Sequence, residues 1–321
     1  VDDLTAQSAD PQNRVQPQAC RLQLSEAQLQ ARRDAGLPDY ADGQSRLSGL
    51  QLYQGGHAER FDLSKPYFVG QRQIERAVEL ASMPASFRWE EPEQPLRRTV
   101  LYDRHRELGG RMSPFAGWEM PLWYSSISDE HAAVRNTGAL FDISHMGCIE
   151  VSGPHALSFL ETVTTNHVHM LEIGQSHYCF LLDTEGIVLD DVIIGRRGSD
   201  RFMVVVNAAN AEKVRAWLQA INSRQCVIDA RFPHRQIEAS ATLTDLAAPA
   251  AGERQLAGLA LQGPVSDRLL RTLRGDRSIG GPLAALRKFG FIEDRIGDIP
   301  SLISRTGYTG EDIGYELYVH P

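Results

Sequence analysis

Residues 304–316 hold an unusual concentration of groups able to bind a polar ligand. Within these thirteen residues lie three glycines, three acids and two tyrosines. Glycines allow the tight turns that such a segment needs, and loops held by a rigid scaffold often carry binding residues. Tyrosine rings and carboxylates from one loop suit a flat, polar heterocycle. We therefore predict a shaped binding loop, with Tyr308 and Glu316 among its polar groups.

Two adjacent acids, Asp190 and Asp191, interrupt an otherwise apolar run at residues 187–194. A buried, unpaired carboxylate costs several kcal/mol or acquires a raised pKa, so something must compensate each of them. Neighbouring side chains on a strand point to opposite faces, and the two acids must therefore serve different environments. One could pair with Arg196 or Arg197 while the other faces a cavity. A purely structural ion pair is the competing interpretation.

Two asparagines follow the next apolar strand. Asn210 precedes a helical pattern and is predicted to be its N-cap. Asn207 offers both a donor and an acceptor to a heterocycle edge, although a role in a turn is equally common for asparagine.

Other motifs give weaker signals. Residues 115–124 form an aromatic loop that could be core or a wall for a ring-shaped ligand. Ser144 and His145 lack the Gly-x-Ser-x-Gly elbow of a hydrolase. His167 and His169 would share a face on a strand, yet no third ligand is evident nearby, and we predict no metal site. Walker and dinucleotide-binding glycine motifs are also absent from the sequence.

Composition narrows the class of protein. The chain has 321 residues, a formal charge of −8 and a pI near 5.7, which argues against broad binding to nucleic acid or to an anionic membrane. It has neither a signal peptide nor a long apolar stretch, so we expect a cytoplasmic protein. Its four cysteines are widely spaced and predict free thiols.

The chain has two compositional regions. A proline- and acid-rich linker at residues 84–95 separates a helical and looped extension, residues 1–95, from residues 96–321. The extension includes a predicted helix at 22–36. Beyond the linker, short helices and strands alternate, which is typical of an α+β protein. The predicted helices are 100–108, 128–135, 155–163, 211–221 and 265–273; the predicted strands are 141–151, 178–182, 187–194, 202–206 and 256–261.

The order of motifs resembles one family. The glycine-cleavage T-protein, a folate-dependent aminomethyltransferase, shows eight motifs in the order found here. They match residues 101–105, 115–121, 141–147, 163–166, 186–191, 206–210, 261–264 and 304–316. The implied fold is an α+β, cloverleaf-like folate-binding aminomethyltransferase fold with antiparallel sheets in Greek-key and ferredoxin-like parts.

The resemblance also implies a site and a reaction. Asp191 matches the family's key acid beside the reacting folate nitrogen, and is the expected catalytic residue. Tyr178, Asn207, Tyr308 and Glu316 match tetrahydrofolate contacts. A methylene group would pass from a lipoylated carrier protein to tetrahydrofolate, with release of ammonia. A carboxylate suits this transfer because it can position the amine and stabilise developing positive charge.

Some family features are not found in the chain. The family's Gly-Ala-Arg-Asp motif and C-terminal barrel are expected beyond Pro321, and residues 1–95 resemble the tail of a related unit. Two alternatives follow from the resemblance. One is the folate domain of a sarcosine or dimethylglycine dehydrogenase, or of a demethylase; the other is a folate-binding regulatory protein without catalysis.

Overall fold

The computed structural model describes residues 22–23, 30, 34, 44–45, 87–230, 232, 235–275 and 282–321. The chain divides into two compact units, residues 1–84 and 85–321. In the first unit, β1 (Leu22–Gln23) pairs antiparallel with β2 (Gln44–Ser45). The predicted helix at 22–36 is therefore wrong at its start. Gln30 and Asp34 are helical, and the rest of that prediction lies outside the described residues.

The second unit opens with two helices that flank a β-hairpin. Helix α4 (Tyr102–Glu107) precedes strands β3 (Arg111–Phe115) and β4 (Trp118–Trp123), and α5 (Ile127–Asn136) follows them. The aromatic loop predicted at 115–124 is thus a hairpin. Its two turn residues, Ala116 and Gly117, both have positive φ, which matches the twist of the strands.

A first antiparallel sheet, called sheet one, has the strand order β10-β6-β9-β8-β7. The strands are β6 (Gly147–Ser152), β7 (Ser176–Leu182), β8 (Val188–Arg196), β9 (Arg201–Val206) and β10 (Thr242–Asp245). The strands predicted at 178–182 and 187–194 are confirmed, and they pair antiparallel as the hairpin β7–β8.

Sheet two has the order β12-β13-β14-β11-β5. Its strands are β5 (Ala139–Asp142), β11 (Ala257–Gln262), β12 (Phe291–Ile296), β13 (Ile299–Ser304) and β14 (Gly314–Val319). The single strand predicted at 141–151 is wrong, because the chain leaves sheet two after β5, turns at 143–146, and enters sheet one as β6.

The helices and the two sheets form layers, with a cluster of buried apolar residues between each pair of neighbouring layers. Helices α6 (Ala156–Val163) and α7 (Ala211–Asn222) pack on one face of sheet one. The other face of sheet one packs against sheet two through Ile193, Met203, Leu302 and Tyr318. The far face of sheet two is covered by α8 (Ser266–Arg274) and α9 (Pro282–Ala285). The α+β class is confirmed.

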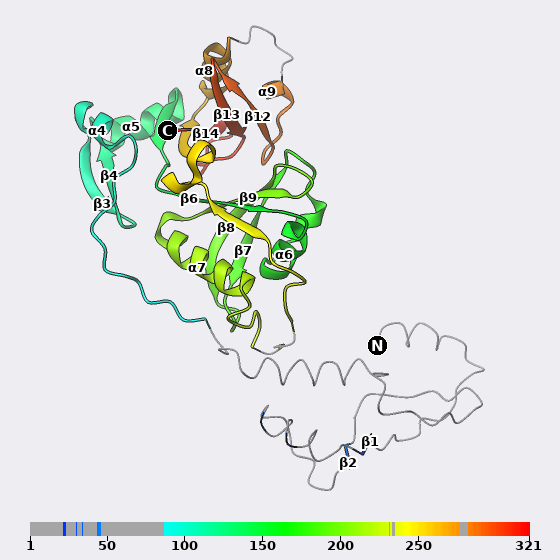
Figure 1. The fold of residues 1–321 in the computed structure, drawn as a ribbon. Coiled ribbons are helices and arrows are strands. Elements are labelled where there is room, and N and C mark those ends of the chain that lie inside the picture. Colours follow the sequence, from blue (N-terminus) through cyan, green and yellow to red (C-terminus); the bar gives the residue numbers. More distant parts are fainter. Residues whose placement is uncertain are drawn as a thin grey trace. The chain divides into compact units, whose positions relative to one another are not determined.

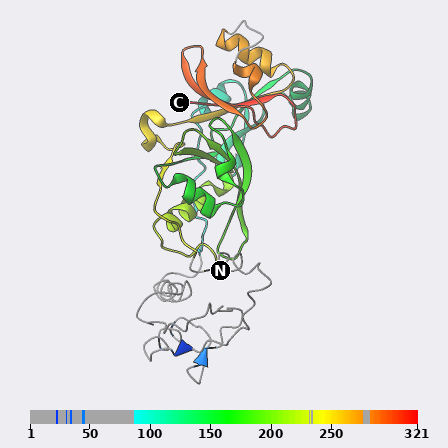
Figure 2. The same ribbon diagram turned by 90° about the vertical axis from the view of Figure 1, so that its right-hand side faces the viewer.

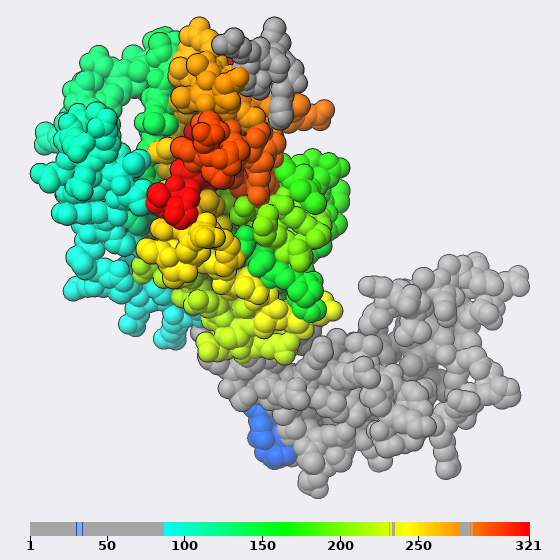
Figure 3. Space-filling view, turned by 45° about the horizontal axis from the view of Figure 1, so that its top comes forward, coloured from blue at the N-terminus to red at the C-terminus, as the bar shows by residue number. Residues whose placement is uncertain are grey.

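The figures show this stacking within the second unit. In Figures 1 and 2 the orange and red strands of sheet two lie above the green strands of sheet one. Short 3₁₀ turns join the elements: η1 (Val168–Met170), η2 (Ala208–Asn210) and η3 (Pro249–Arg254). The red C-terminal residues lie at the surface beside the yellow η3 segment (Figure 3), where His320 Nε2 is 3.2 Å from the Gly252 carbonyl oxygen.

Two further expectations can be compared with the described residues. Cys148, Cys179 and Cys226 are buried free thiols, as predicted, and burial raises the pKa of Cys148 and of Cys179 to about 12. Such thiols are poor nucleophiles at neutral pH. None of the helices in the described ranges has the length and apolar character needed to cross a lipid bilayer.

Candidate functional site

The two acids of β8 point to opposite faces of sheet one, as predicted. Asp190 lies on the helix-covered face with Val192 and Ile194, and only 3% of its surface is exposed. Asp191 lies on the face turned toward sheet two, directly across the ladder from Phe180. Alternation along a strand therefore gives the two carboxylates separate roles.

Amide donors from the segment after β9 compensate the buried Asp190. Its carboxylate accepts hydrogen bonds from the Asn207 backbone N–H (2.9 Å), from Asn207 Nδ2 (3.0 Å) and from Asn210 Nδ2 (2.6 Å). The expected arginine partner is wrong. Arg196 donates to backbone carbonyls, including that of Leu171, and Arg197 pairs with Glu150 and Glu293.

The asparagine assignments change accordingly. Asn210 precedes α7, but its side chain makes no capping hydrogen bond, because its amide donates to Asp190 instead. Asn207 Nδ2 lies 3.0 Å from Asp190 Oδ1, from the Asp191 carbonyl oxygen and from Asp191 Oδ1. Asn207 thus connects the buried acid to the one that faces sheet two.

Asp191 is held from both sides. Tyr178 donates its hydroxyl to Oδ2 over 2.6 Å, and Asn207 Nδ2 lies 3.0 Å from Oδ1. The pKa of Tyr178 is raised to about 12, first by this hydrogen bond to Asp191, so the hydroxyl remains a donor at neutral pH. The rings of Tyr178 and Phe180 meet edge to face, with centroids 5.4 Å apart, and each residue is about 40% exposed. A carboxylate thus lies beside accessible aromatic rings.

The loop that carries Tyr308 is packed around Gln262. Gln262 is 1% exposed, and its Nε2 donates to the carbonyl oxygens of Thr306 and Tyr315. A Cβ atom at Gly307 would lie 2.0 Å from Gln262 Oε1, and one at Gly314 would lie 2.3 Å from it. Close packing against Gln262 therefore requires glycine at both positions. A third glycine of the loop, Gly310, has a positive φ, a backbone conformation that favours glycine.

Glu316 lies on β14, on the same face as Tyr318 and turned toward sheet one. It is 5% exposed and accepts hydrogen bonds from Thr306 Oγ1 (2.6 Å) and the Tyr318 hydroxyl (3.3 Å). Burial raises the pKa of Glu316, and these two hydrogen bonds only partly oppose the effect. Glu316 thus loses its proton less readily than an exposed glutamate does.

The charges of both acids influence Tyr308. Although Tyr308 is largely exposed, loss of hydration raises its pKa to about 12, together with the charges of Glu316, Asp191 and Tyr178. Hydrogen bonds bring together three of the five predicted site residues, Tyr178, Asp191 and Asn207, whereas the hydrogen bonds of Glu316 are to Thr306 and Tyr318. Asp191 comes from sheet one and Glu316 from sheet two, on the faces of the two sheets that are turned toward each other.

Sequence reasoning missed three supporting residues. Phe180 borders Asp191, and its position two residues after Tyr178 on one strand could have revealed it. Thr306 and Gln262 hold Glu316 and the loop, respectively. Their partners are distant in sequence, so no local pattern marks them. Ser144 and His145 lie in the turn after β5 rather than on a strand, and Ser144 donates its hydroxyl to Asp142.

Known proteins share this fold and these segments. The family model of the GCVT N-terminal domain matches residues 101–321. An aminomethyltransferase of Symbiobacterium thermophilum is 39% identical over 228 residues, which cover 70% of this chain and 55% of that protein. The aminomethyltransferase of Bacillus subtilis is 39% identical over 224 residues, covering 70% and 54%.

A solved structure of an aminomethyltransferase also matches this chain. The crystal structure of glycine cleavage system aminomethyltransferase T from Bartonella henselae matches with a TM-score of 0.56 and 33% identity, covering 70% of this chain and 53% of that one. The chain thus spans about half the length of the relatives it matches. It belongs to the glycine-cleavage T-protein family, through the GCVT N-terminal domain.

Proposed function

We propose that this protein is a tetrahydrofolate-dependent aminomethyltransferase. It would accept the aminomethyl group of a lipoylated carrier protein and pass the methylene to tetrahydrofolate. The observation that carries the proposal is Asp191, whose two oxygens are held by Tyr178 and Asn207 beside exposed aromatic rings. Relatives that match 70% of the chain carry the name aminomethyltransferase, which supports the same reaction.

The residues present fit tetrahydrofolate as the substrate. A pterin is a flat heterocycle with adjacent N–H and amino donors along one edge, and a carboxylate offers two acceptors in matching geometry. Glu316 supplies a buried carboxylate in the site, and Tyr178, Phe180 and Tyr308 supply rings. We assign Glu316 to the pterin edge and the rings to its flat surfaces and the adjoining part of the folate.

Asp191 is assigned to the reacting end of the folate. Its carboxylate would hold the folate amine by a hydrogen bond and stabilise the positive charge that develops during transfer. Tyr178 and Asn207 fix the carboxylate in position, so little rearrangement is needed when charge appears. The methylene carbon leaves sulfur and nitrogen of the carrier arm for two folate nitrogens. The two protons displaced from those nitrogens end on the carrier thiol and on the departing ammonia.

The partner and the compartment are part of the proposal. The expected partner is a lipoylated carrier of the glycine-cleavage type, with no nucleic acid or membrane involved. The charge of −8 argues against broad binding to nucleic acid or to an anionic membrane, and we propose a cytoplasmic location. We further propose that residues 96–321 form the folate-binding domain and that residues 1–95 are an extension.

The alternatives have less support. A protein that only bound folate could use an amide at position 191, since an amide is less costly to place in a partly buried site than a carboxylate. A dehydrogenase folate domain would share the pocket but would not need a lipoylated carrier.

The test is a transfer assay with the chain, an aminomethyl-lipoyl carrier and tetrahydrofolate. The proposal predicts ammonia and methylenetetrahydrofolate in equal amounts. Folate binding without either product would support the regulatory alternative. Product formed from sarcosine or dimethylglycine with an electron acceptor, and none from the carrier, would support the dehydrogenase alternative.

A further inference from the structure

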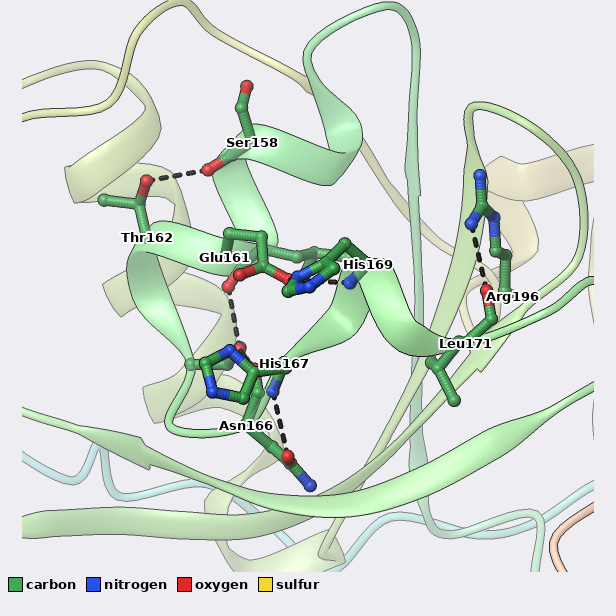
Figure 4. Close-up of polar contacts among 10 residues, drawn as sticks. Ser158, Glu161, Thr162, Asn166, His167, His169, Leu171 and Arg196 are labelled. Atoms are coloured by element: carbon green, nitrogen blue, oxygen red, sulfur yellow. Dashed lines mark hydrogen bonds and ion pairs between the residues drawn. The ribbon is translucent and has the colours of Figure 1, made fainter.

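A carboxylate and two imidazoles meet away from the folate site. Glu161 belongs to α6, His167 immediately precedes η1, and His169 lies within η1. One ligand atom from each of the three residues lies within 4.8 Å of the other two. Figure 4 shows the Glu161 carboxylate beside the His169 ring, with the His167 ring on the same side of the turn. This group is called the Glu-His-His cluster below.

The sequence pattern did not reveal this cluster. His167 and His169 would share a face on a strand, but His169 lies in the 3₁₀ turn η1 and His167 immediately precedes it. The third group, Glu161, is six residues earlier on that helix. The turn therefore brings the two histidines to Glu161, which the spacing of His167 and His169 in the sequence did not predict.

Hydrogen bonds orient the cluster. Glu161 Oε1 accepts from the backbone N–H of His169 (2.6 Å) and lies 3.0 Å from His169 Nδ1. The two imidazole centroids are 5.5 Å apart. Asn166 Oδ1 accepts from the backbone N–H of His167 (2.9 Å), and Asn166 Nδ2 donates to the Tyr178 carbonyl oxygen (3.0 Å). In metal sites, hydrogen bonds to the residues that coordinate the ion fix the orientation of those residues.

Charge in the cluster also suits a cation. Within the described part of the chain, the ion pair of Glu161 is with His169 and not with a lysine or arginine. The negative charge is therefore not already neutralised by a fixed cation.

A buried nitrogen on β7, next to the residue whose carbonyl oxygen accepts from Asn166, is an independent observation. Nε2 of His177 is buried and has no hydrogen-bond partner among the described residues. His177 thus has an unused nitrogen, and buried polar atoms of this kind require an explanation.

We propose that Glu161, His167 and His169 bind one divalent transition-metal ion of the zinc class. Imidazole nitrogens with one carboxylate oxygen are typical ligands for zinc, cobalt, nickel and copper, whereas magnesium and calcium prefer oxygen ligands alone. Zinc bonds of about 2.1 Å place tetrahedral ligand atoms roughly 3.4 Å apart, so modest rotations of the exposed histidines complete the site. Water takes the remaining position.

Metal binding changes a local interaction. The ion replaces the hydrogen bond between Glu161 and His169 Nδ1, and the coordinating nitrogens must be unprotonated. The ion joins α6 to the segment that follows it. That segment is attached to β7, because the Thr165 N–H donates to the Phe180 carbonyl oxygen and Thr165 Oγ1 accepts from the Phe180 N–H. We therefore expect the metal to stabilise the edge of the sheet that carries Tyr178.

Calorimetric titration of the chelator-treated chain with Zn²⁺ tests the proposal, with no folate or carrier present. Visible absorption with Co²⁺ reports the coordination geometry. We expect one ion per chain, micromolar affinity, a Co²⁺ spectrum of four or five coordination, and a melting temperature that rises with Zn²⁺. Glu161→Gln and His167→Gln should each weaken binding at least tenfold. His131→Gln removes an exposed histidine of α5 and should bind as the unmodified chain does.

Three results would overturn the proposal. They are no saturable binding of Zn²⁺ or Co²⁺, equal binding by Glu161→Gln and His167→Gln, and competition by equimolar Mg²⁺. Both substituted side chains are at least partly exposed, and circular dichroism of the metal-free variants checks that they fold. Since no transfer reaction is measured, the result is independent of the proposed function.

Discussion

The hydroxyl of Tyr178 lies 2.6 Å from Oδ2 of Asp191, on neighbouring strands of one hairpin. The same ring presents an exposed face and meets Phe180 edge to face. Tyr178 therefore combines two functions that can be separated experimentally: it orients the carboxylate through its hydroxyl, and it offers a flat surface through its ring.

Tyr178→Phe should separate these functions. Loss of the hydroxyl frees Asp191 on one side, so we expect kcat to fall about tenfold, a loss of about 1.4 kcal/mol of transition-state stabilisation. The KM for tetrahydrofolate should change less than threefold, because the ring remains. Steady-state kinetics of the transfer reaction measure both. A raised KM with normal kcat would mean that the hydroxyl only binds substrate.

Asn207→Ala should destabilise the protein. The substitution removes the side-chain donor shared by Asp190 and Asp191, and the buried Asp190 keeps only its contacts with the Asn207 backbone and Asn210. We expect the free energy of unfolding in urea to fall by about 1–3 kcal/mol. Asn136→Ala is the matched control, since its amide makes one exposed helical contact. Equal effects of the two substitutions would refute the role assigned to Asn207.

Gly307→Ala should disturb the loop that carries Tyr308. The added methyl group would overlap Gln262, which then loses its contacts with Thr306 and Tyr315. We expect a loss of about 1–3 kcal/mol in stability and weaker folate binding by fluorescence titration. At Gly198 the nearest atom would lie 3.6 Å from a new Cβ, so Gly198→Ala should be tolerated. Normal folate affinity in Gly307→Ala would show that this packing does not shape the site.

Glu316 should make stability depend on pH in an unusual direction. Burial raises its pKa in the folded state above the ordinary value of 4.5, so the folded protein binds this proton more tightly than the unfolded chain. Its contribution is complete below pH 4.5 and is lost as pH rises through the folded-state pKa. In the unmodified chain, the free energy of unfolding should therefore include a decrease between pH 4.5 and 8 that comes from Glu316. Urea denaturation of Glu316→Gln over the same pH range should lack that decrease. Glu107→Gln, at an exposed position, is the control. Parallel profiles for the unmodified chain and Glu316→Gln would contradict the assignment.

Local chemistry predicted much of the fold and the opposite orientations of Asp190 and Asp191. The β7–β8 hairpin was predictable because its turn residues lie between two apolar runs, and Asp191 because a carboxylate conflicts with a buried strand. The hairpin at β3–β4 was missed: its turn is Ala116–Gly117, without the usual asparagine or aspartate, and each strand contains a proline.

The remaining features depend on contacts that sequence spacing does not encode. Asn207 and Asn210 reach Asp190 only after β8 pairs with β9, which is why an arginine partner was the wrong expectation. The break at 143–146 arises because β5 joins the other sheet. Glu161 meets His169 only through the turn at η1. In each case the partner is selected by tertiary packing, which overrides local preference.

The most direct test of the central claim is the transfer assay on Asp191→Asn. Asparagine keeps the size of the side chain and can still accept a hydrogen bond from Tyr178, but it removes the negative charge that the mechanism requires. We predict that ammonia release falls at least a hundredfold while the affinity for tetrahydrofolate stays within threefold of that of the unmodified chain. Near-normal ammonia release by Asp191→Asn would contradict the account.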